Sequence, residues 1–263
     1  MKKTLLQQLI PTIALLLVTS LQLFSQEEIE ADSSRNKRNE LTDLVHKKDY
    51  DDRGKKITFP RTFGGLTFTR IDWGFSRPID DGSFTFSEDN SFLSYSKASN
   101  FGFDIAQFGV RFNDVVKVYL SSGFEWNYLR LKKDIFLNTD ATPLDYTVSN
   151  VEFKKNILTS TYLRLPLSVE FRGKPNRNGD RLKLAVGAMT GILLKGSQRI
   201  KDNKGKHRYK DNFNLASFQY GAFARIGFGS MAIFTKYYMN DMFENSPAQK
   251  GLHNFTFGAT LGF

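Results

Sequence analysis

The chain has 263 residues, of which 40% are hydrophobic and 14% aromatic, and its formal net charge is +10. This length suits one large or two small domains, and the many aromatic residues (25 are Phe) favour strands over helices. The absence of Cys excludes disulfides, thiolate chemistry and a lipid anchor on an N-terminal cysteine.

The first element is the N-terminal stretch "MKKTLLQQLIPTIALLLVTSLQLFSQEE". Two lysines precede an apolar run from Ile13 to Phe24, and Ser25 and an acidic stretch follow. This layout predicts a secretory signal peptide over residues 1–25, so we expect the protein to leave the cytoplasm. The alternative is an uncleaved anchor helix, but the run is short and contains three polar residues. Residues 26–60 are polar and charged, which predicts a flexible periplasmic segment.

From Phe63 onward, apolar residues recur at every second position, as in strands with one apolar face. Such alternation predicts eight strands, at about 66–75, 101–112, 115–130, 158–172, 181–195, 213–228, 231–239 and 252–263. Within 101–112 the apolar set slips by one residue, which predicts a β-bulge near Ala106 or Gln107. A similar shift lies between Phe68 and Ile71.

Long and short connections alternate along the chain, at 76–100, 113–114, 131–157, 173–180, 196–212, 229–230 and 240–251. Outer-membrane barrels have this pattern of short periplasmic turns and longer external loops. We therefore predict an all-β protein, an eight-stranded antiparallel up-and-down transmembrane β-barrel over residues 61–263, located in the cell outer membrane. Backbone facing lipid must satisfy its hydrogen bonds internally, so the strands must close into a ring.

In such a barrel the apolar faces contact lipid and the charged faces fill the lumen. A small ring of this size is filled by its own side chains, and buried charges need partners. We expect a lumen charge network of Glu125, Arg164, Glu170, Arg172, Lys183 and Arg225. If the chain were instead a soluble barrel, the same residues would be ordinary surface charges.

The last expected strand, "FTFGATLGF", ends in the aromatic residue Phe263. A terminal aromatic residue resembles the C-terminal signal that the outer-membrane barrel assembly machinery recognises. Phe263 is therefore the candidate assembly signal, and that machinery is an expected partner. Phe263, Phe171 and Phe112 are also expected in the aromatic belt at the periplasmic interface.

Several segments resemble the Bacteroidetes outer-membrane β-barrel proteins called PorT-like. They are "FGFDIAQFGVRF" (101–112), "STYLRLPLSVEFRG" (160–173), "LAVGAMTGILL" (184–194) and the final strand. The resemblance covers about residues 60–263 and lies in pattern more than in particular residues. It implies an outer-membrane barrel, and it makes an accessory role in protein secretion an alternative function, with secretion-system proteins as partners.

No catalytic constellation, metal site or cofactor site is expected. The three His, at 46, 207 and 253, lie far apart in the sequence and form no cluster with metal-ligand spacing. "DNKGKHRYKDN" (202–212) lacks the pattern of a calcium loop, and "RTFGG" (61–65) does not precede a helix as a phosphate loop does. We therefore predict a protein that is not an enzyme.

The expected loop 196–212 is basic and is a candidate surface-binding loop that would contact lipopolysaccharide. Its basic residues are Arg199, Lys201, Lys204, Lys206, Arg208 and Lys210. The simpler interpretation is a solvated loop tip. Nucleic acid is not an expected partner, and we expect a monomer. The expected function is a structural, adhesion or interaction role; the remaining alternatives are a lipid A-modifying enzyme and a soluble lipocalin-like binder.

Overall fold

The computed structural model describes residues 59–68 and 70–263. The expected signal peptide, residues 1–25, lies outside the described residues, and so does the expected flexible segment except for Phe59 and Pro60. Among the described residues, no helix is long and apolar enough to cross a membrane.

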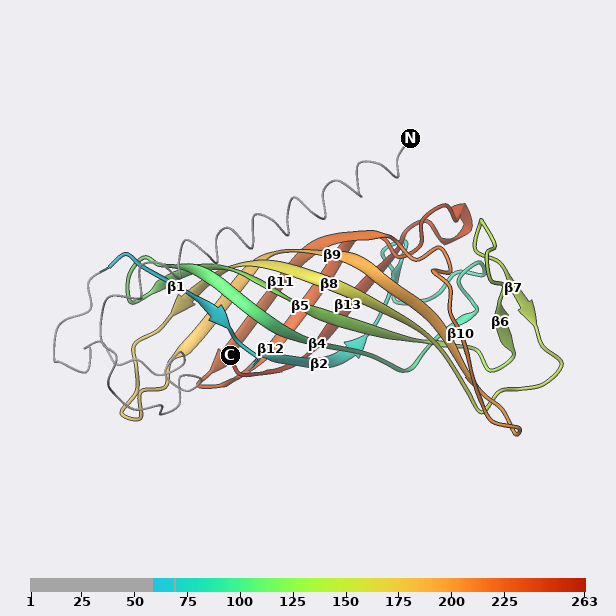
Figure 1. The fold of residues 1–263 in the computed structure, drawn as a ribbon, viewed down its shortest axis with the longest axis horizontal. Helices are drawn as coiled ribbons and strands as arrows, with labels where there is room; N and C mark the ends of the chain where they lie inside the picture. Colours follow the sequence, from blue (N-terminus) through green and yellow to red (C-terminus); the bar gives the residue numbers. More distant parts are fainter. Residues whose placement is uncertain (1–58, 69) are drawn as a thin grey trace, which may run out of the picture. The chain divides into compact units, whose positions relative to one another are not determined.

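Eight long antiparallel strands close into a barrel, which confirms the predicted fold (Figure 1). The first wall strand consists of two pieces, β1 (Arg61–Leu66) and β2 (Ile71–Ser76), and both pair with β4 (Leu93–Arg111). The others are β5 (Val116–Leu131), β8 (Lys155–Arg172), β9 (Leu182–Lys201), β11 (Phe218–Phe228), β12 (Met231–Asp241) and β13 (Leu252–Leu261). The ring closes where β13 pairs with β2, with Ala259 opposite Trp73.

The interruption of the first strand coincides with a bulge in its neighbour β4. Leu66 lies opposite Ala106, whereas Ile71 lies opposite Phe103. Between these two pairs the first wall strand has four residues, and β4 has only two. The pairing of β4 with β5 also shifts register between Asp104 and Ala106. The bulge is therefore one residue earlier than the sequence predicted. The slip of apolar residues located it only approximately, because a bulge moves the alternation over several positions.

The connections divide between the two ends of the barrel. One end, called here the long-loop end, carries 77–92, 132–154, 202–217 and 242–251. The other, the short-turn end, carries 112–115, 173–181 and 229–230. The long connections contain β3 (Ile79–Asp80), β6 (Ile135–Leu137), β7 (Tyr146–Val148), β10 (Lys206–Tyr209) and the 3-10 helix η1 (Pro247–Gln249). Figure 1 shows β6, β7 and β10 gathered at the long-loop end.

Expected boundaries at this end were wrong in several strands. β4 begins at Leu93 rather than at 101, and β8 begins at Lys155 rather than at 158, because their pairing with β5 and β9 continues to these residues. Residues 196–201 extend β9, because the pairing with β8 continues up to Lys155 opposite Lys201. The segment expected as the loop 196–212 is therefore mostly a β-hairpin, in which β10 folds back on β9. The strand expected from 213 begins at Phe218, because Phe213 and Asn214 adopt positive φ angles of 47° and 50° and form a turn.

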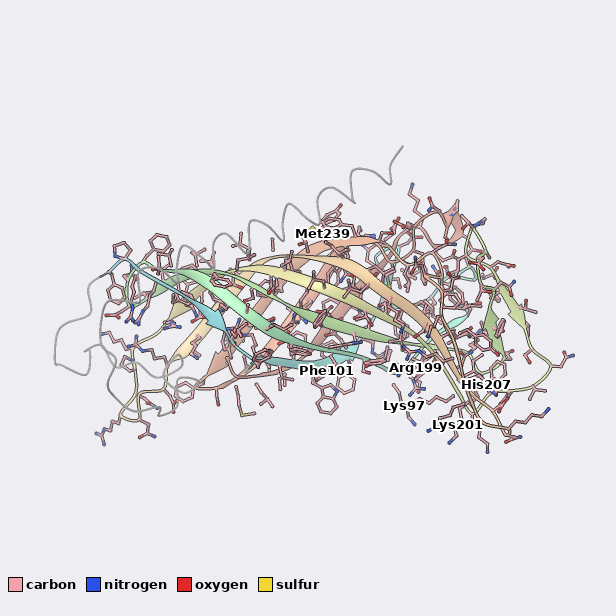
Figure 2. The ribbon with its side chains drawn as sticks, viewed as in Figure 1. Lys97, Phe101, Arg199, Lys201, His207 and Met239 are labelled. Atoms are coloured by element: carbon pink, nitrogen blue, oxygen red, sulfur yellow. The ribbon has the colours of Figure 1, made fainter. Side chains whose placement is uncertain are left out.

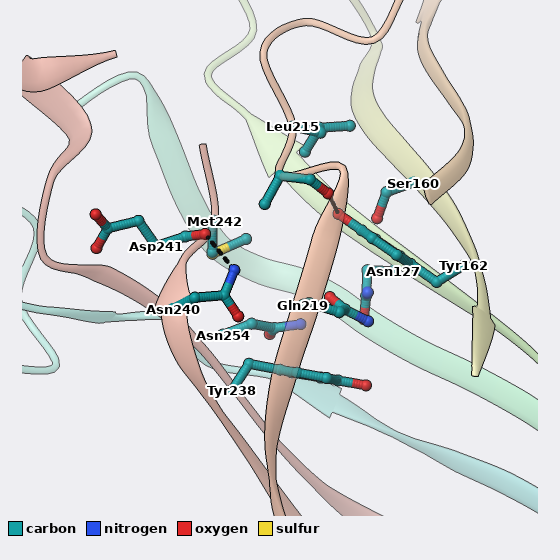
Figure 3. Close-up of a pocket in the computed structure, with 11 residues that line it drawn as sticks. Asn127, Ser160, Tyr162, Leu215, Gln219, Tyr238, Asn240, Asp241, Met242 and Asn254 are labelled. Carbon is teal, nitrogen blue, oxygen red and sulfur yellow. Dashed lines mark hydrogen bonds between the residues drawn. The ribbon is translucent and has the colours of Figure 1, made fainter. Parts of the chain in front are cut away.

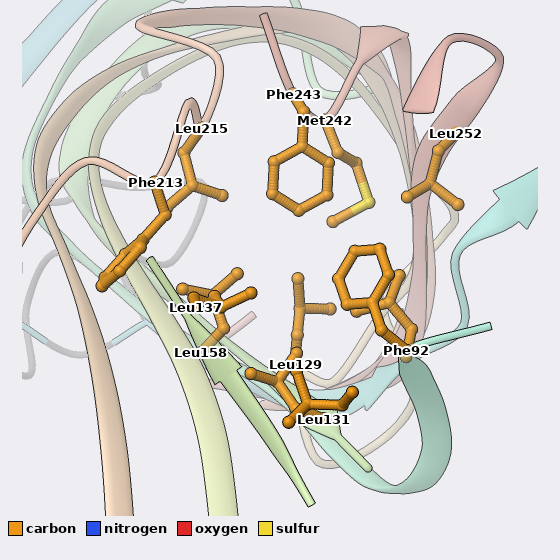
Figure 4. Packing of buried hydrophobic residues seen from close by; sticks show 12 residues of the cluster. Phe92, Leu129, Leu131, Leu137, Leu158, Phe213, Leu215, Met242, Phe243 and Leu252 are labelled. Carbon is orange, nitrogen blue, oxygen red and sulfur yellow. The ribbon is translucent and has the colours of Figure 1, made fainter. Parts of the chain in front are cut away.

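Apolar side chains close the long-loop end from within the ring of strands (Figure 4). Leu129, Leu131 and Leu158 come from the wall, and Phe213 and Phe243 come from the loops. Phe92, Leu137, Leu215, Met242 and Leu252 complete the part of this cluster labelled in Figure 4. The loops thus fold over the mouth and bury an apolar cap above the lumen.

Candidate functional site

Below the cap, the inward faces of the strands are charged and buried. Asp72, Asp104 and Glu125 are 0% exposed, and Arg164 is 3% exposed. Large apolar side chains instead point outward, as in Trp73 and Ile233, which are 67% and 66% exposed. Because residues alternate sides along a strand, the charged set and the apolar set occupy opposite faces of the wall. A soluble lipocalin-like binder has the reverse arrangement, with an apolar cavity and a polar exterior.

Arg164 on β8 is the centre of this charged lumen. Its Nη2 lies 2.8 Å from Asp104 Oδ1, and its Nη1 lies 2.7 Å from Asp72 Oδ2. Nη1 also lies 3.4 Å from Glu125 Oε2, and Nε donates to Asp104 Oδ1 at 3.1 Å. One guanidinium thus joins carboxylates from three other strands, β2, β4 and β5. Such multiple pairing offsets the desolvation of buried charges.

Lys236 on β12 connects the same carboxylates from the opposite side of the ring. Its Nζ lies 2.9 Å from Glu125 Oε2 and 3.0 Å from Asp72 Oδ2. Arg225 Nη2 on β11 lies 2.8 Å from the same Asp72 oxygen. The Tyr238 hydroxyl donates to Glu125 Oε1 at 2.8 Å. The network therefore ties β2, β5, β11 and β12 together across the lumen.

A second charged cluster lies nearer the short-turn end. Arg172 Nε lies 2.6 Å from Glu170 Oε1, and Lys117 Nζ lies 4.4 Å from the ring centroid of Tyr119. The ammonium of Lys183 donates to the backbone oxygens of Gly229, at 2.8 Å, and of Phe263. Charged groups thus fill this half of the lumen as well.

The six residues of the expected lumen network all come from inward faces, but they form two groups. Glu125, Arg164 and Arg225 belong to the central network, whereas Glu170, Arg172 and Lys183 belong to the second cluster. Sequence reasoning missed Asp72, Asp104, Lys236 and Arg70, of which Arg70 lies 3.4 Å from Asp104. Asp72 and Asp104 lie close to the strand break and the bulge, where the shifted alternation concealed which way they point.

The side chain of Phe263 does not belong to a lipid-facing aromatic belt, as had been expected. It is 4% exposed and packs with Ala185 and Ala232. The Lys183 ammonium lies 5.3 Å from the Phe263 ring centroid. Gly262 explains the difference, because its φ of +76° turns the chain and ends the alternation that would have directed residue 263 outward.

A polar recess lies between the cap and the central network (Figure 3). It has about 290 Å³ of empty space, part of it open to solvent, and Asn127, Gln219 and Asn254 line it with Tyr162 and Tyr238. The Gln219 Nε2 atom has no hydrogen-bond partner among the described residues. The recess has room for about one water molecule.

Two of the three His are described, and neither lies in the lumen. His253 Nδ1 lies 2.6 Å from the Tyr237 hydroxyl, and His253 Nε2 lies 3.3 Å from Asp241 Oδ1. The register of β12 and β13 shifts between Tyr237 and Asp241, so these contacts bridge a bulge. His207 lies 3.4 Å from Asp202 in the hairpin. Within residues 59–68 and 70–263, no group of three or more His, Asp or Glu could hold a metal ion.

The basic residues of the expected surface-binding loop lie on the β9–β10 hairpin and just after it. Arg199 and Lys201 are on β9, Lys206 and Arg208 are on β10, and Lys204 is in the turn between them. Lys210 follows β10, and all six side chains are exposed. Figure 2 shows Arg199, Lys201 and His207 at the long-loop end, and Lys97 of β4 at the same end.

The barrel fold agrees with the comparison against protein families. Residues 62–242 match the family described as outer membrane protein beta-barrel domain. The chain belongs to this family.

No curated protein matches the sequence. Among solved structures, the chain is similar to Ail, the attachment invasion locus protein of Yersinia pestis, in complex with the heparin analogue sucrose octasulfate. That match has 13% identity and a TM-score of 0.31, and it covers 78% of this chain and 100% of Ail. A likeness this slight carries no argument about function.

Proposed function

We propose that this chain is a non-catalytic protein of the outer membrane that acts through its external surfaces, with the barrel as a rigid scaffold. The observation that carries the proposal is the closed lumen. Arg164 and Lys236 are 3% and 2% exposed, are held by carboxylates, and lie beneath an apolar cap. A lumen filled in this way offers neither a diffusion path nor a catalytic pocket, which leaves the outside of the barrel for interaction.

Family membership and the outward apolar face support a location in the outer membrane. Trp73, Ile233 and Met231 expose 60% or more of their surface, which water would disfavour and lipid favours. The barrel assembly machinery would insert such a chain, and we propose it as a partner. The long-loop end would then face the exterior, as in other barrels of this kind.

The PorT-like resemblance suggests a more specific role as an accessory component of secretion. No contact in the described residues favours that role over adhesion or another interaction. Both roles require a protein or glycan partner at one end of the barrel, so an experiment that locates the partner distinguishes them.

Photo-crosslinking in intact cells tests the proposal. A photoreactive amino acid at Tyr209 samples the external hairpin, and one at Lys174 samples a periplasmic turn. We expect the protein to fractionate with the outer membrane, to migrate differently on gels before and after heating, and to crosslink from position 209. Recovery in the soluble fraction, or discrete conductance steps in planar bilayers, would refute a membrane scaffold with a closed lumen. Crosslinks from position 174 alone would favour the secretion role.

A further inference from the structure

The outward face of β8, β9 and β10 carries rows of basic residues at the long-loop end. Lys155 of β8 lies opposite Lys201 of β9, which lies opposite Lys206 of β10. In the next row, Arg199 lies opposite Arg208. Directly opposed residues share a face of the sheet, with Cβ atoms roughly 4.5–5.5 Å apart. The pairing of the hairpin therefore places like charges side by side.

The neighbouring strands extend these rows into a larger surface. Ile157 of β8 lies between Arg199 on one side and Arg130 of β5 on the other. Lys195 of β9 lies opposite Thr161, on the same outward face. The basic wall patch is defined here as Arg130, Lys155, Lys195, Arg199, Lys201, Lys206 and Arg208. Lys204 and Lys210 of the expected loop do not belong to these rows.

The basic wall patch lacks acidic partners. Among the described residues, none of its seven members has a carboxylate oxygen within 4.0 Å. Asp202, in the hairpin turn, is engaged by His207 at 3.4 Å. Like charges directly opposite in a sheet are destabilising, so an anion on this face would relieve their repulsion.

The position of the patch on the wall indicates what kind of anion fits. Along the outward face of β5, the aromatic residues Phe124, Trp126 and Tyr128 are followed directly by Arg130. The ring centroids of Trp126 and Phe101 are 5.8 Å apart, and Figure 2 shows Lys97, Arg199 and Lys201 beyond Phe101 toward the long-loop end. Aromatic rings of barrels lie at the interface between lipid and water. The patch is therefore at headgroup height and faces sideways, toward lipid.

Hydroxyl groups lie between the aromatic and the basic residues. Thr159 of β8 is opposite Tyr128 on one side and Ser197 on the other. Thr159 is 2% exposed, and its Oγ1 has no hydrogen-bond partner among the described residues. Arg208 Nη2 reaches the Ser197 hydroxyl at 3.2 Å. The patch thus combines guanidinium and ammonium groups, both of which donate hydrogen bonds to phosphate oxygens, and it borders on buried hydroxyl groups.

We propose that the basic wall patch binds the phosphate groups of a phosphorylated glycolipid of the lipopolysaccharide type in the outer leaflet. This inference rests on the proposed location in the outer membrane. A soluble polyanion would approach the loop tips from the exterior, whereas the patch faces sideways above an aromatic belt. The lipid's acyl chains would lie along the apolar wall below, and its phosphates would lie among the basic residues.

The test compares two variants of the full chain that lose the same charge. The patch variant carries Lys155→Gln, Arg199→Gln, Lys201→Gln and Lys206→Gln. The control variant carries Lys133→Gln, Lys174→Gln, Arg177→Gln and Lys250→Gln, which are exposed residues outside the patch. Each protein is folded in detergent and mixed with bisphosphorylated lipid A, or with lipid A from which both phosphates have been removed. Native mass spectrometry then counts the bound lipids.

We expect the wild type and the control to retain bisphosphorylated lipid A, and the patch variant to bind it roughly tenfold more weakly or worse. Dephosphorylated lipid A should bind weakly to all three proteins, and added salt should weaken the phosphate-dependent binding. Equal retention by the two variants would overturn the inference, and so would binding of a sulfated glycan in preference to lipid A. Heat-modifiable migration, measured on the same samples, reports separately whether the barrel folds. The patch can therefore fail while the proposed membrane scaffold stands.

Discussion

Replacing Arg164 with Met tests whether the charged lumen holds the barrel together. The substitution preserves approximate size but removes the guanidinium that contacts Asp72, Asp104 and Glu125. Asp72 keeps two other cationic partners, and Glu125 keeps Lys236. Asp104 keeps only the 3.4 Å contact with Arg70, although it is 0% exposed. The main cost is therefore one poorly paired buried carboxylate, for which about 3–5 kcal/mol is typical.

The assay is urea unfolding of the barrel in lipid vesicles, followed by the fluorescence of the two Trp. With a slope of about 2 kcal/mol per molar urea, a loss of about 4 kcal/mol lowers the midpoint by roughly 2 M. Adding Asp104→Asn to Arg164→Met should recover part of this loss, because the orphaned charge is gone. Lys133→Met breaks an exposed pair with Glu152 at 3.6 Å and should cost less than about 1 kcal/mol. If Arg164→Met and Lys133→Met unfold at the same urea concentration, the reasoning about the lumen is wrong.

Three further outcomes are expected. Gly102→Ala should destabilise the barrel by about 1–3 kcal/mol in the same urea assay, because the added Cβ would lie 2.6 Å from Arg164 Nη1. An unchanged urea midpoint would contradict this and show that the guanidinium can move aside. A spin label at Leu167→Cys, on the outward face, should be accessible to oxygen rather than to a water-soluble nickel complex. A label at Lys204→Cys, in the hairpin turn, should be accessible to the nickel complex instead. Accessibility of position 167 to the nickel complex would contradict a barrel with its apolar face toward lipid. The backbone amide of Gly205 donates to Asp202 and is the main cause that lowers the pKa of this carboxyl. The amide resonance of Gly205 should therefore stay constant while the pH is above the usual carboxyl pKa, and shift only when the pH falls through the lowered pKa of Asp202. Asp202→Asn should abolish that shift.

Much of the architecture could be predicted from the sequence because the side-chain period of a strand is a local property. Alternation along β5 and β8 showed which residues share a face, and it placed Glu125 and Arg164 on the polar one. The alternation of long and short connections then distinguished a membrane barrel from a soluble sandwich. These signals need only neighbouring residues, so one chain contains them in full.

The partners in the lumen required the closed ring. Arg164 is 92 residues from Asp72, and Lys236 is 111 residues from Glu125. Only closure of β2, β4, β5, β8 and β12 around one axis brings these groups together. The break after β1 and the bulge in β4 further concealed the orientation of Asp72 and Asp104, because each irregularity moves the alternation by a residue or more.

The sequence by itself determined that the wall is two-faced and that the segment 196–212 is basic. The tertiary structure decided where two key groups point. Extended alternation would have directed Phe263 toward lipid, but the turn at Gly262 carries its ring inward. A loop of basic residues would have pointed into solvent, but the return of β10 onto β9 aligns Lys201 with Lys206 and Lys155 on the wall. Backbone turns and pairing between distant strands set these directions, and neither follows from the order of residues within one strand.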